Sequence, residues 1–293
     1  ALLTAAQFDA LQARLPTLVN AGTCSVAGRG TLHYLKTGDP PDLDAIRAQY
    51  PDIRVACLRP VLPVLTRPER QPQLFDTMTR WREIAQERDM PLWEVAVQYE
   101  RDASGWTRTQ VIDEMWRVAA KMHRQTHAPY EEDVHAPASP FRPDMATEWK
   151  AHMRSSRRLT DDLTANVIKW AYGAGAGIPG VETVAGPMGS GGGYVYAALC
   201  AVKDAHNLSD DDLLRGLFIA AGIGAIAFTR TEPTGECIGC SGECGICGAM
   251  AAAGIAEMAG GTPAQVENAA SLSLQSAIGL PCDPIPGGFS QPC

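Results

Sequence analysis

Apolar side chains recur every three to four residues along most of this chain, which is the spacing of one face of an α-helix. This pattern predicts helices over residues 4–19, 74–88, 92–101, 109–126, 145–172, 194–205, 213–228 and 248–259. In the fourth of these the apolar stripe consists of Val111, Met115, Val118, Ala119 and Met122. No segment alternates apolar and polar residues convincingly, as a half-buried strand would. We therefore expect a mainly α fold, with room for a small α/β piece in residues 1–65.

Prolines mark the predicted breaks between these elements. A cluster of four prolines cannot propagate a helix, so we place a linker at residues 66–73. It separates an N-terminal segment, 1–65, from an all-α domain, 74–293. Four further prolines predict a long loop over 129–143, of the kind that can cover a site.

Helix start signals support the later elements. Ser209 is a natural N-cap followed by three aspartates, and Thr262 to Gln265 reads as a capping box with proline at the first helical position. The helix at 213–228 is apolar almost all round, so we expect it to be central and buried. No window of 18 uninterrupted apolar residues indicates a membrane span, and no signal-peptide pattern opens the sequence. We expect a cytoplasmic location and no membrane partner.

Composition narrows the class of protein. The 293 residues are 45% hydrophobic and carry a net charge of -8, with a pI of about 5.3. Lysine and arginine are scattered and form no basic stripe, so we expect no nucleic-acid partner. Nine cysteines, an odd number in a chain without an export signal, favour metal binding or reduced thiols over disulfides.

Three glycine-rich stretches bear on ligand binding. Residues 175–180 match G-x-G-x-x-G by letter, but they follow a helix and lack the acidic residue that closes a dinucleotide unit, so we reject that site. The run at 184–193 precedes a helix, whose N-terminal N–H groups suit a carboxylate; a plain interhelical turn is the alternative. The stretch 22–30, with Cys24, predicts a surface turn and a small buried thiol more readily than a ligand loop.

Basic and imidazole side chains form two further candidate binding sites, one for a carboxylate and one for a metal ion. The run from Arg154 to Arg158, which includes Arg157, forms either a solvated face or a carboxylate clamp. His123 and His127 stand four residues apart, a spacing that can bind zinc, with Glu131, Glu132 and His135 following. Favourable charges near a helix C-terminus explain the two histidines more simply.

Six of the nine cysteines lie in the last sixty residues, and all but Cys237 stand directly beside Gly, Pro or Ser, which predicts loops. One grouping is a compact zinc staple of Cys237, Cys240, Cys244 and Cys247, although zinc pairs are normally separated by about twelve or more residues. The other grouping takes one cysteine per loop: Cys240, Cys282 and Cys293. Thiolates suit iron–sulfur clusters, and three of them leave one iron of a 4Fe–4S cube open as a Lewis acid.

Several stretches resemble the α-chain catalytic domain of iron–sulfur L-serine dehydratases: GCSGECGICGAMAAA at 239–253, GGTPAQVENAA at 260–270, GLPCDP at 279–284 and QPC at 291–293. Upstream, RSSRRLT at 154–160 and AGPMGSGGG at 185–193 are similar to two further motifs of that family. The resemblance covers roughly residues 74–293.

The resemblance implies a helical catalytic domain whose Cys-bearing loops surround a buried 4Fe–4S cluster. It implies cluster ligation by Cys240, Cys282 and Cys293, with separations of 42 and 11 residues, and one iron not bound by cysteine. Gly189, Ser190, Gly191 and Gly192 would form the turn that faces a small amino-acid substrate, with Arg154 and Arg157 near its carboxylate.

The implied reaction is β-elimination from serine or a serine-like hydroxy amino acid, giving a 2-oxo acid and ammonia; no residue is assigned as the base. This sequence departs from the family in three ways. The family's Ser-Ser-Ser-His-Thr segment has no counterpart in residues 1–73, and the family favours Gly at the positions of Arg158, Asp161 and Asp162. Family members also continue beyond the position of Cys293. We therefore expect a C-terminal piece, a second β-type subunit or a homodimer to complete the site. A cysteine-desulfidase-type or other cluster-dependent lyase and a zinc-stapled binding protein are the alternatives.

Overall fold

A computed structural model of the chain describes residues 4–15, 18–26, 30–37, 41–51, 74–132, 134–135, 144–155, 159–186, 191–231 and 235–278. The chain divides into two compact units, Ala1–Val61 and Leu62–Cys293. Helices dominate, which confirms the mainly α prediction. The predicted linker lies outside the described residues, so its limits remain predictions.

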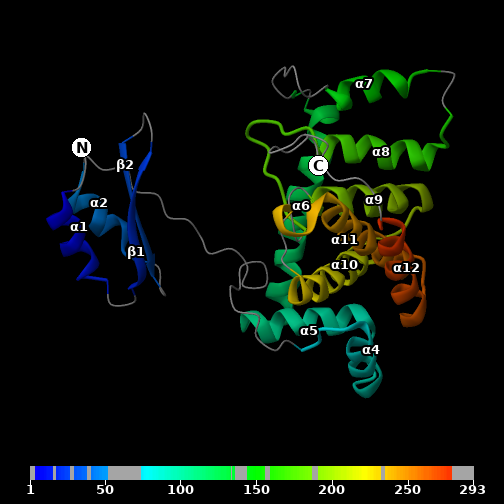
Figure 1. Ribbon diagram of the computed structural model, residues 1–293, viewed down its shortest axis with the longest axis horizontal. Helices are drawn as coiled ribbons and strands as arrows, with labels where there is room; N and C mark the ends of the chain where they lie inside the picture. The colour runs from blue at the N-terminus through cyan, green and yellow to red at the C-terminus, as the bar shows by residue number, and fades with distance from the viewer. Residues whose placement is uncertain are drawn as a thin grey trace. The chain divides into compact units, whose positions relative to one another are not determined.

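The first unit is a small α/β piece, as the sequence allowed. Its elements are α1 (Ala5–Gln12), β1 (Leu18–Val26), β2 (Gly30–Thr37) and α2 (Leu43–Gln49). The two strands pair antiparallel, and α1 lies beside them through a ring contact of 4.5 Å between Phe8 and His33 (Figure 1). The turn predicted over 22–30 is wrong for most of that stretch, because pairing with the neighbouring strand overrides the turn preference of its glycine and serine residues.

The second unit is a stack of helices: α4 (Met78–Glu87), α5 (Leu92–Ser104), α6 (Arg108–Glu131), α7 (Met145–His152), α8 (Asp162–Ala174), α9 (Gly191–His206), α10 (Asp210–Arg230), α11 (Gly235–Met258) and α12 (Pro263–Ser276). The Ser209 cap and the Thr262–Gln265 capping box both form as predicted. Each satisfies N–H groups that the helix itself leaves unpaired.

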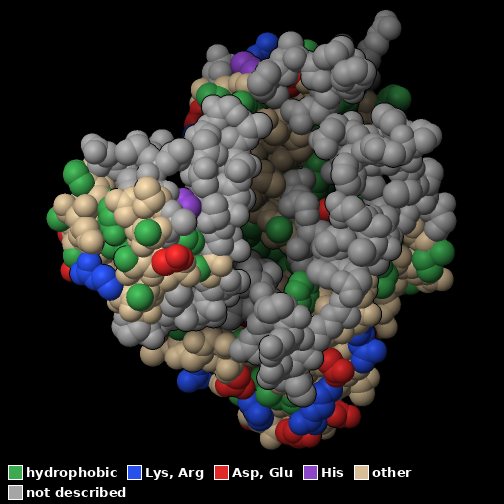
Figure 2. Space-filling model, turned by 60° about the vertical axis from the view of Figure 1, so that its left-hand side comes forward, with side chains coloured by type: hydrophobic (Ala, Val, Ile, Leu, Met, Phe, Trp, Pro, Cys, Tyr) green, Lys and Arg blue, Asp and Glu red, His purple; other side chains and the backbone are tan. Residues whose placement is uncertain are grey.

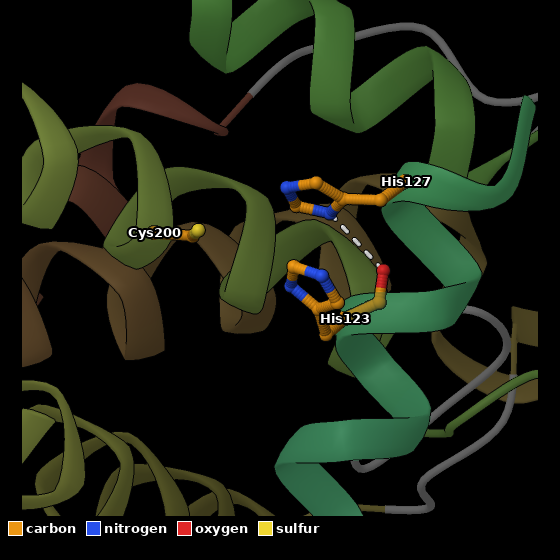
Figure 3. Close-up of side chains that lie close together, drawn as sticks. All are labelled: His123, His127 and Cys200. Atoms are coloured by element: carbon orange, nitrogen blue, oxygen red, sulfur yellow. Dashed lines mark hydrogen bonds between the residues drawn. The ribbon is translucent and has the colours of Figure 1, made fainter. Parts of the chain in front are cut away.

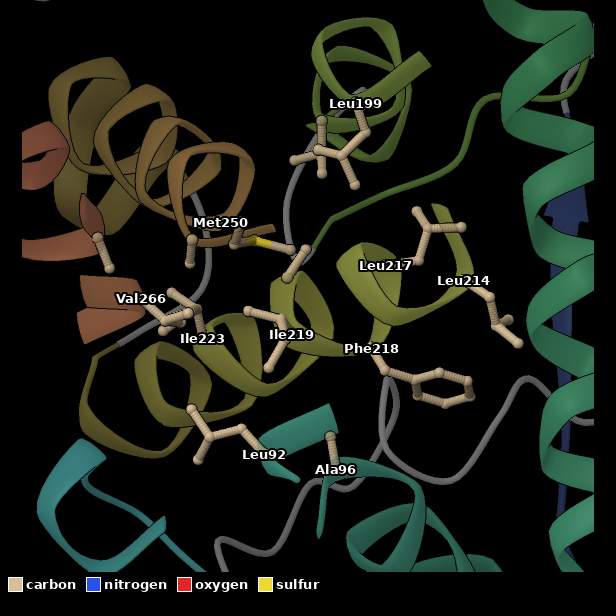
Figure 4. Close-up of a cluster of buried hydrophobic side chains, with 14 of the residues drawn as sticks. Leu92, Ala96, Leu199, Leu214, Leu217, Phe218, Ile219, Ile223, Met250 and Val266 are labelled. Carbon is tan, nitrogen blue, oxygen red and sulfur yellow. The ribbon is translucent and has the colours of Figure 1, made fainter. Parts of the chain in front are cut away.

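Helix α10 is the centre of this unit. It packs against α5, α9 and α11 (Figure 1), and Phe218 and Ile219 are completely buried among the side chains of these neighbours (Figure 4). Among the described helices it alone has the length and hydropathy of a membrane span, and 56% of that apolar window is buried inside the protein. That burial is what a core helix shows, in agreement with the prediction for 213–228.

Charged side chains on the outside of this unit pair with one another. Arg80 Nη1 lies 3.1 Å from Glu83 Oε2 and 3.0 Å from Glu87 Oε1, and Arg108 forms a two-point contact with Glu94. Blue and red side chains are accordingly intermixed at the lower end of the view in Figure 2.

Four predicted boundaries are wrong. The helix predicted over 4–19 ends at Gln12, and Leu18 already belongs to β1. Helix α6 continues through Pro129 to Glu131, since its last turns are buried against α8 and α9. The single helix predicted over 145–172 is two helices, because Asp161 caps a new start by accepting from the N–H of Thr164. The cysteine-rich stretch before residue 248 is not a loop; from residue 235 onward it forms the first half of α11.

Candidate functional site

The glycine-rich start of α9 is packed tightly against the segment before it. The N–H of Gly192 donates to the carbonyl of Val184 at 3.0 Å, so this amide is used within the protein. A methyl group on Gly192 would lie 2.8 Å from Val184, and one on Gly186 would lie 2.6 Å from the nitrogen of Gly192. Only glycine fits these positions, because two stretches of backbone are in contact there.

Gln125 of α6 holds the glycine segment in place, by which we mean the described residues 184–186 and 191–193. Its side chain is 3% exposed, its Oε1 accepts from the N–H of Val184 at 3.0 Å, and its Nε2 donates to the carbonyl of Ala174 at 3.2 Å. A methyl group on Gly193 would lie 2.6 Å from the same amide. The amide thus joins α6, the end of α8 and the glycine segment. Sequence reasoning missed Gln125, since nothing distinguishes a polar residue in mid-helix before its partners are known.

Cys247 of α11 supports the same segment from the other side. Its Sγ donates to the carbonyl of Gly186 at 3.2 Å, and a methyl group on Gly191 would lie 2.4 Å from that sulfur. Burial raises the pKa of the Cys247 thiol to about 12, and the neighbouring Cys244 and Glu243 add to the shift. The thiol is therefore protonated at neutral pH and serves as a buried hydrogen-bond donor.

The helical course of α11 argues against a zinc staple. Cys237 and Cys247 are ten residues apart on one continuous helix, so their backbones are separated by about 15 Å at 1.5 Å per residue. Zinc–sulfur bonds are about 2.3 Å long, so one ion cannot collect thiolates over that distance. The four-cysteine grouping does not form a single tetrahedral site on this helix.

The α11–α12 hairpin brings the chain back toward Cys240. A methyl group on Gly245 of α11 would lie 3.0 Å from the side chain of Ala277, just after α12 ends. Cys240 precedes Gly245 by five residues, and Cys282 follows Ala277 by five residues. Cys240 therefore lies about 8 Å from Gly245 along α11, and five extended residues limit Cys282 to at most about 18 Å from Ala277.

An apolar cavity of about 150 Å³ adjoins the glycine segment. Its lining includes Gly186 and Gly192 together with side chains of α6, α10 and α11, among them Met122, Phe218 and Met250. Glu100 and Glu114 are the acidic residues in that lining. Because its walls are mostly apolar, the cavity is better suited to keeping water away from the glycine segment than to binding a polar amino acid directly.

A second cluster, of His123, His127 and Cys200, lies where α6 meets α9 (Figure 3). Burial lowers the pKa of His127 to about 4, so its ring is neutral at pH 7. Burial also raises the pKa of the Cys200 thiol to about 11, and Asp204 adds to that shift. The sequence had drawn attention to the two histidines but not to Cys200, which joins them only through helix packing.

The predicted site residues are only partly described. Gly191 and Gly192 are buried at the start of α9, whereas Arg154 is exposed just beyond the end of α7. Cys240 lies in α11, and its side chain is outside the description. The predictions for Gly189, Ser190, Arg157, Cys282 and Cys293 fall wholly outside the described residues.

Residues 87–293 match the protein family described as serine dehydratase alpha chain. The chain belongs to this family. The match confirms the resemblance seen in the cysteine and glycine motifs, and it extends from α4 through the last cysteine. The matched residues include α9, α11 and the two cysteines that follow α12 in the sequence.

Three relatives illustrate the similarity. The chain is 34% identical over 149 residues to the Bacillus subtilis "Probable L-serine dehydratase, alpha chain", an alignment that covers 50% of each sequence. It is 32% identical over 143 residues to the Peptoniphilus asaccharolyticus "L-serine dehydratase, alpha chain", covering 48% of this chain and 49% of that one. It is 49% identical over 84 residues to a Mycobacterium bovis "L-serine dehydratase", covering 29% and 18%. The chain thus spans about half the length of the α-chain relatives it matches.

Proposed function

We propose that this chain is the catalytic α part of an L-serine dehydratase, acting on serine or a serine-like hydroxy amino acid. Support comes from the family match over residues 87–293 and from relatives whose names carry that activity. In this reaction the α-proton and the β-hydroxyl leave from adjacent carbons as water. The resulting enamine takes up one water and releases ammonia and a 2-oxo acid.

We assign Cys240, Cys282 and Cys293 as ligands of a 4Fe–4S cluster. The observation that carries this assignment is the α11–α12 hairpin. Ala277, five residues before Cys282 in the sequence, lies beside Gly245 of α11, which is five residues after Cys240. Three thiolates fit the group, because they leave one iron without a cysteine ligand. When bound, the cluster would supply a Lewis acid that polarises the departing hydroxyl.

The residues of this chain bind and orient the substrate in this proposal. Backbone N–H groups around Gly189 and Ser190 hold the carboxylate, with Arg154 or Arg157 as the countercharge. Gln125 and Cys247 keep the glycine segment at a fixed position, so the carboxylate is fixed relative to α11. A β-type subunit or a second copy of the chain completes the site.

Anaerobic iron and sulfide analysis is the most informative test. The reconstituted chain is expected to hold about four irons and four sulfides, as one cube requires. Cys240→Ser should lose most of that iron, whereas Cys247→Ser, which changes a thiol that is not assigned as a ligand, should keep it. A fully loaded Cys240→Ser protein, or a wild-type chain that binds no iron, would overturn the ligand assignment.

The reaction itself is tested by ammonia release under the same anaerobic conditions, with and without a β-type chain. L-serine should give ammonia and a 2-oxo acid in equal amounts, and air should abolish the reaction together with the brown colour of the cluster. Faster turnover of L-cysteine with release of sulfide would replace the dehydratase assignment with a desulfidase.

A further inference from the structure

We propose that His123, His127 and Cys200 form a second metal site, separate from the cluster cysteines, for a divalent ion of the zinc type. Each residue offers one ligand atom, and the three atoms lie within 4.8 Å of one another. Figure 3 shows both imidazole rings projecting from α6 toward α9, where the sulfur of Cys200 lies. Two imidazoles and a thiolate form a donor set that zinc favours, with a fourth position left for water or another ligand.

Helix geometry places the two histidines together. Residues four apart project from the same face of a helix, and the two rings are stacked with centroids 3.9 Å apart. In a tetrahedral zinc site, bonds of about 2.0–2.3 Å put the ligand atoms roughly 3.3–3.8 Å from each other. Closing the present spacing to that value requires the ligand atoms to approach one another by at most about 1.5 Å, and α6 and α9 are already in contact.

The other nitrogen of each ring is already engaged, as in protein zinc sites. Nδ1 of His127 lies 3.1 Å from the carbonyl oxygen of His123 and 2.6 Å from the hydroxyl of Thr126. Nδ1 of His123 lies 3.3 Å from the hydroxyl of Tyr196. These contacts orient both rings. Nε2 of His127 remains for an ion, and Nε2 of His123 faces Glu131 Oε2 at 3.9 Å.

Burial and charge also fit a bound cation. His127 and Cys200 are 4% and 6% exposed, whereas the side chain of His123 is 46% exposed and gives an ion a path from solvent. Glu131 Oε2 lies 3.9 Å from Nε2 of His123, and Asp204 Oδ2 lies 3.9 Å from the sulfur of Cys200. Either carboxylate can supply or orient the fourth ligand.

Two nearby lysines oppose metal binding. Lys203 acts on the Cys200 thiol and is itself paired with Asp210, whose Oδ1 lies 3.0 Å from its Nζ. Nζ of Lys169 lies 3.8 Å from the centroid of the Trp170 ring, which in turn stacks on His127 at 3.6 Å. Against these two positive charges stand the Cys200 thiolate that a metal would create and the carboxylates of Glu131, Asp204 and Asp210. The balance of charge at the site is therefore negative.

The alternative role of these residues is a structural stack of His123, His127 and Trp170 that binds no ion. The metal site and the stack differ in the role of Cys200, because a stack of rings does not need the Cys200 sulfur. They also differ in the role of Thr126, because the Thr126 hydroxyl contributes to a metal site chiefly by orienting the His127 ring.

Cobalt titration of the full chain distinguishes them. After chelator treatment, one equivalent of Co²⁺ should give the intense visible bands of a tetrahedral ion and a sulfur-to-cobalt charge-transfer band, and Zn²⁺ should displace it. Cys200→Ser should remove the charge-transfer band and weaken binding at least tenfold. Thr126→Val should keep that band and weaken binding by about 10- to 100-fold, the usual effect of losing an orienting partner.

Cys247→Ser is the matched control. Cys247 is also buried, but it contacts Gly191, nine residues and roughly 13 Å along α9 from Cys200. It should bind cobalt as the wild type does. Cys240→Ser should also keep the cobalt site while losing iron, which separates this proposal from that of the cluster. If folded wild-type chain binds no cobalt, or if Cys200→Ser and Cys247→Ser behave alike, the site does not exist.

Discussion

Replacing Gln125 tests the idea that one buried amide fixes the glycine segment. Gln125→Leu keeps most of the side-chain volume but leaves the Val184 N–H and the Ala174 carbonyl without their partner. A buried backbone group left unpaired costs about 1–3 kcal/mol, so the two together cost roughly 2–6 kcal/mol, less what the added apolar side chain recovers. We expect a net loss of about 3 kcal/mol in the free energy of unfolding.

That loss corresponds to a fall of about 6–12 °C in Tm for a unit of this size. Urea unfolding monitored by far-UV circular dichroism measures it directly. Gln86→Leu on α4 is the matched control, because Gln86 is exposed and its replacement should change the free energy by less than about 0.5 kcal/mol.

Gln125→Glu adds a pH dependence with a definite sign. A carboxylate can accept from Val184 but cannot donate to Ala174, so the folded state favours the protonated acid and raises the pKa of the introduced Glu. Its stability is therefore greatest below the unfolded pKa of about 4.3 and is lost as pH rises through the raised folded value. Equal stabilities of the Leu variant and the wild type, or a Glu variant without this pH dependence, would refute the role given to the amide.

Three further predictions concern packing and charge. Gly191→Ala should destabilise the protein because its methyl group would meet the Cys247 sulfur at 2.4 Å, and the added Cys247→Ala change should recover part of the loss in a double-mutant cycle; purely additive effects would contradict the contact. Gly222→Ala should lower Tm more than Gly105→Ala. The methyl group at position 222 would strike the fully buried Trp81 ring, at 2.1 Å, whereas the one at position 105 meets no atom and costs only the strain of a left-handed backbone. Burial raises the pKa of Glu257 against the opposing effect of Arg215, so its ionisation costs stability as pH rises; Glu257→Gln should raise Tm at pH 8 and leave it unchanged at pH 4, and the reverse ranking would show that Arg215 dominates.

Local signals predicted much of the helical unit. Ser209 and Thr262 cap helices where their sequence patterns place them, and the stripe from Val111 to Met122 packs into the core. These features depend on residues within one or two turns, so the sequence alone suffices to find them. The family resemblance was also readable from short motifs, because the spacing of cysteine, glycine and proline around the last helices is specific.

Other features required distant partners. Glycine and cysteine between residues 235 and 247 locally favour turns, but packing of α11 against α10 and α12 makes them helical. The strand pairing of residues 18–37 was missed for a similar reason, since a hairpin is stabilised by the neighbouring strand rather than by its own alternation.

The sequence by itself determined the helical class, the caps, the family and the set of candidate cysteines. Only the tertiary structure decided which side chains meet: Gln125 with Val184, Cys247 with Gly186, and Cys200 with the two histidines. These pairs are separated by about 60 to 77 residues along the chain, so no local pattern encodes them. Their contacts depend on how α6, α9 and α11 pack, and that packing is fixed by burial of the whole core around α10.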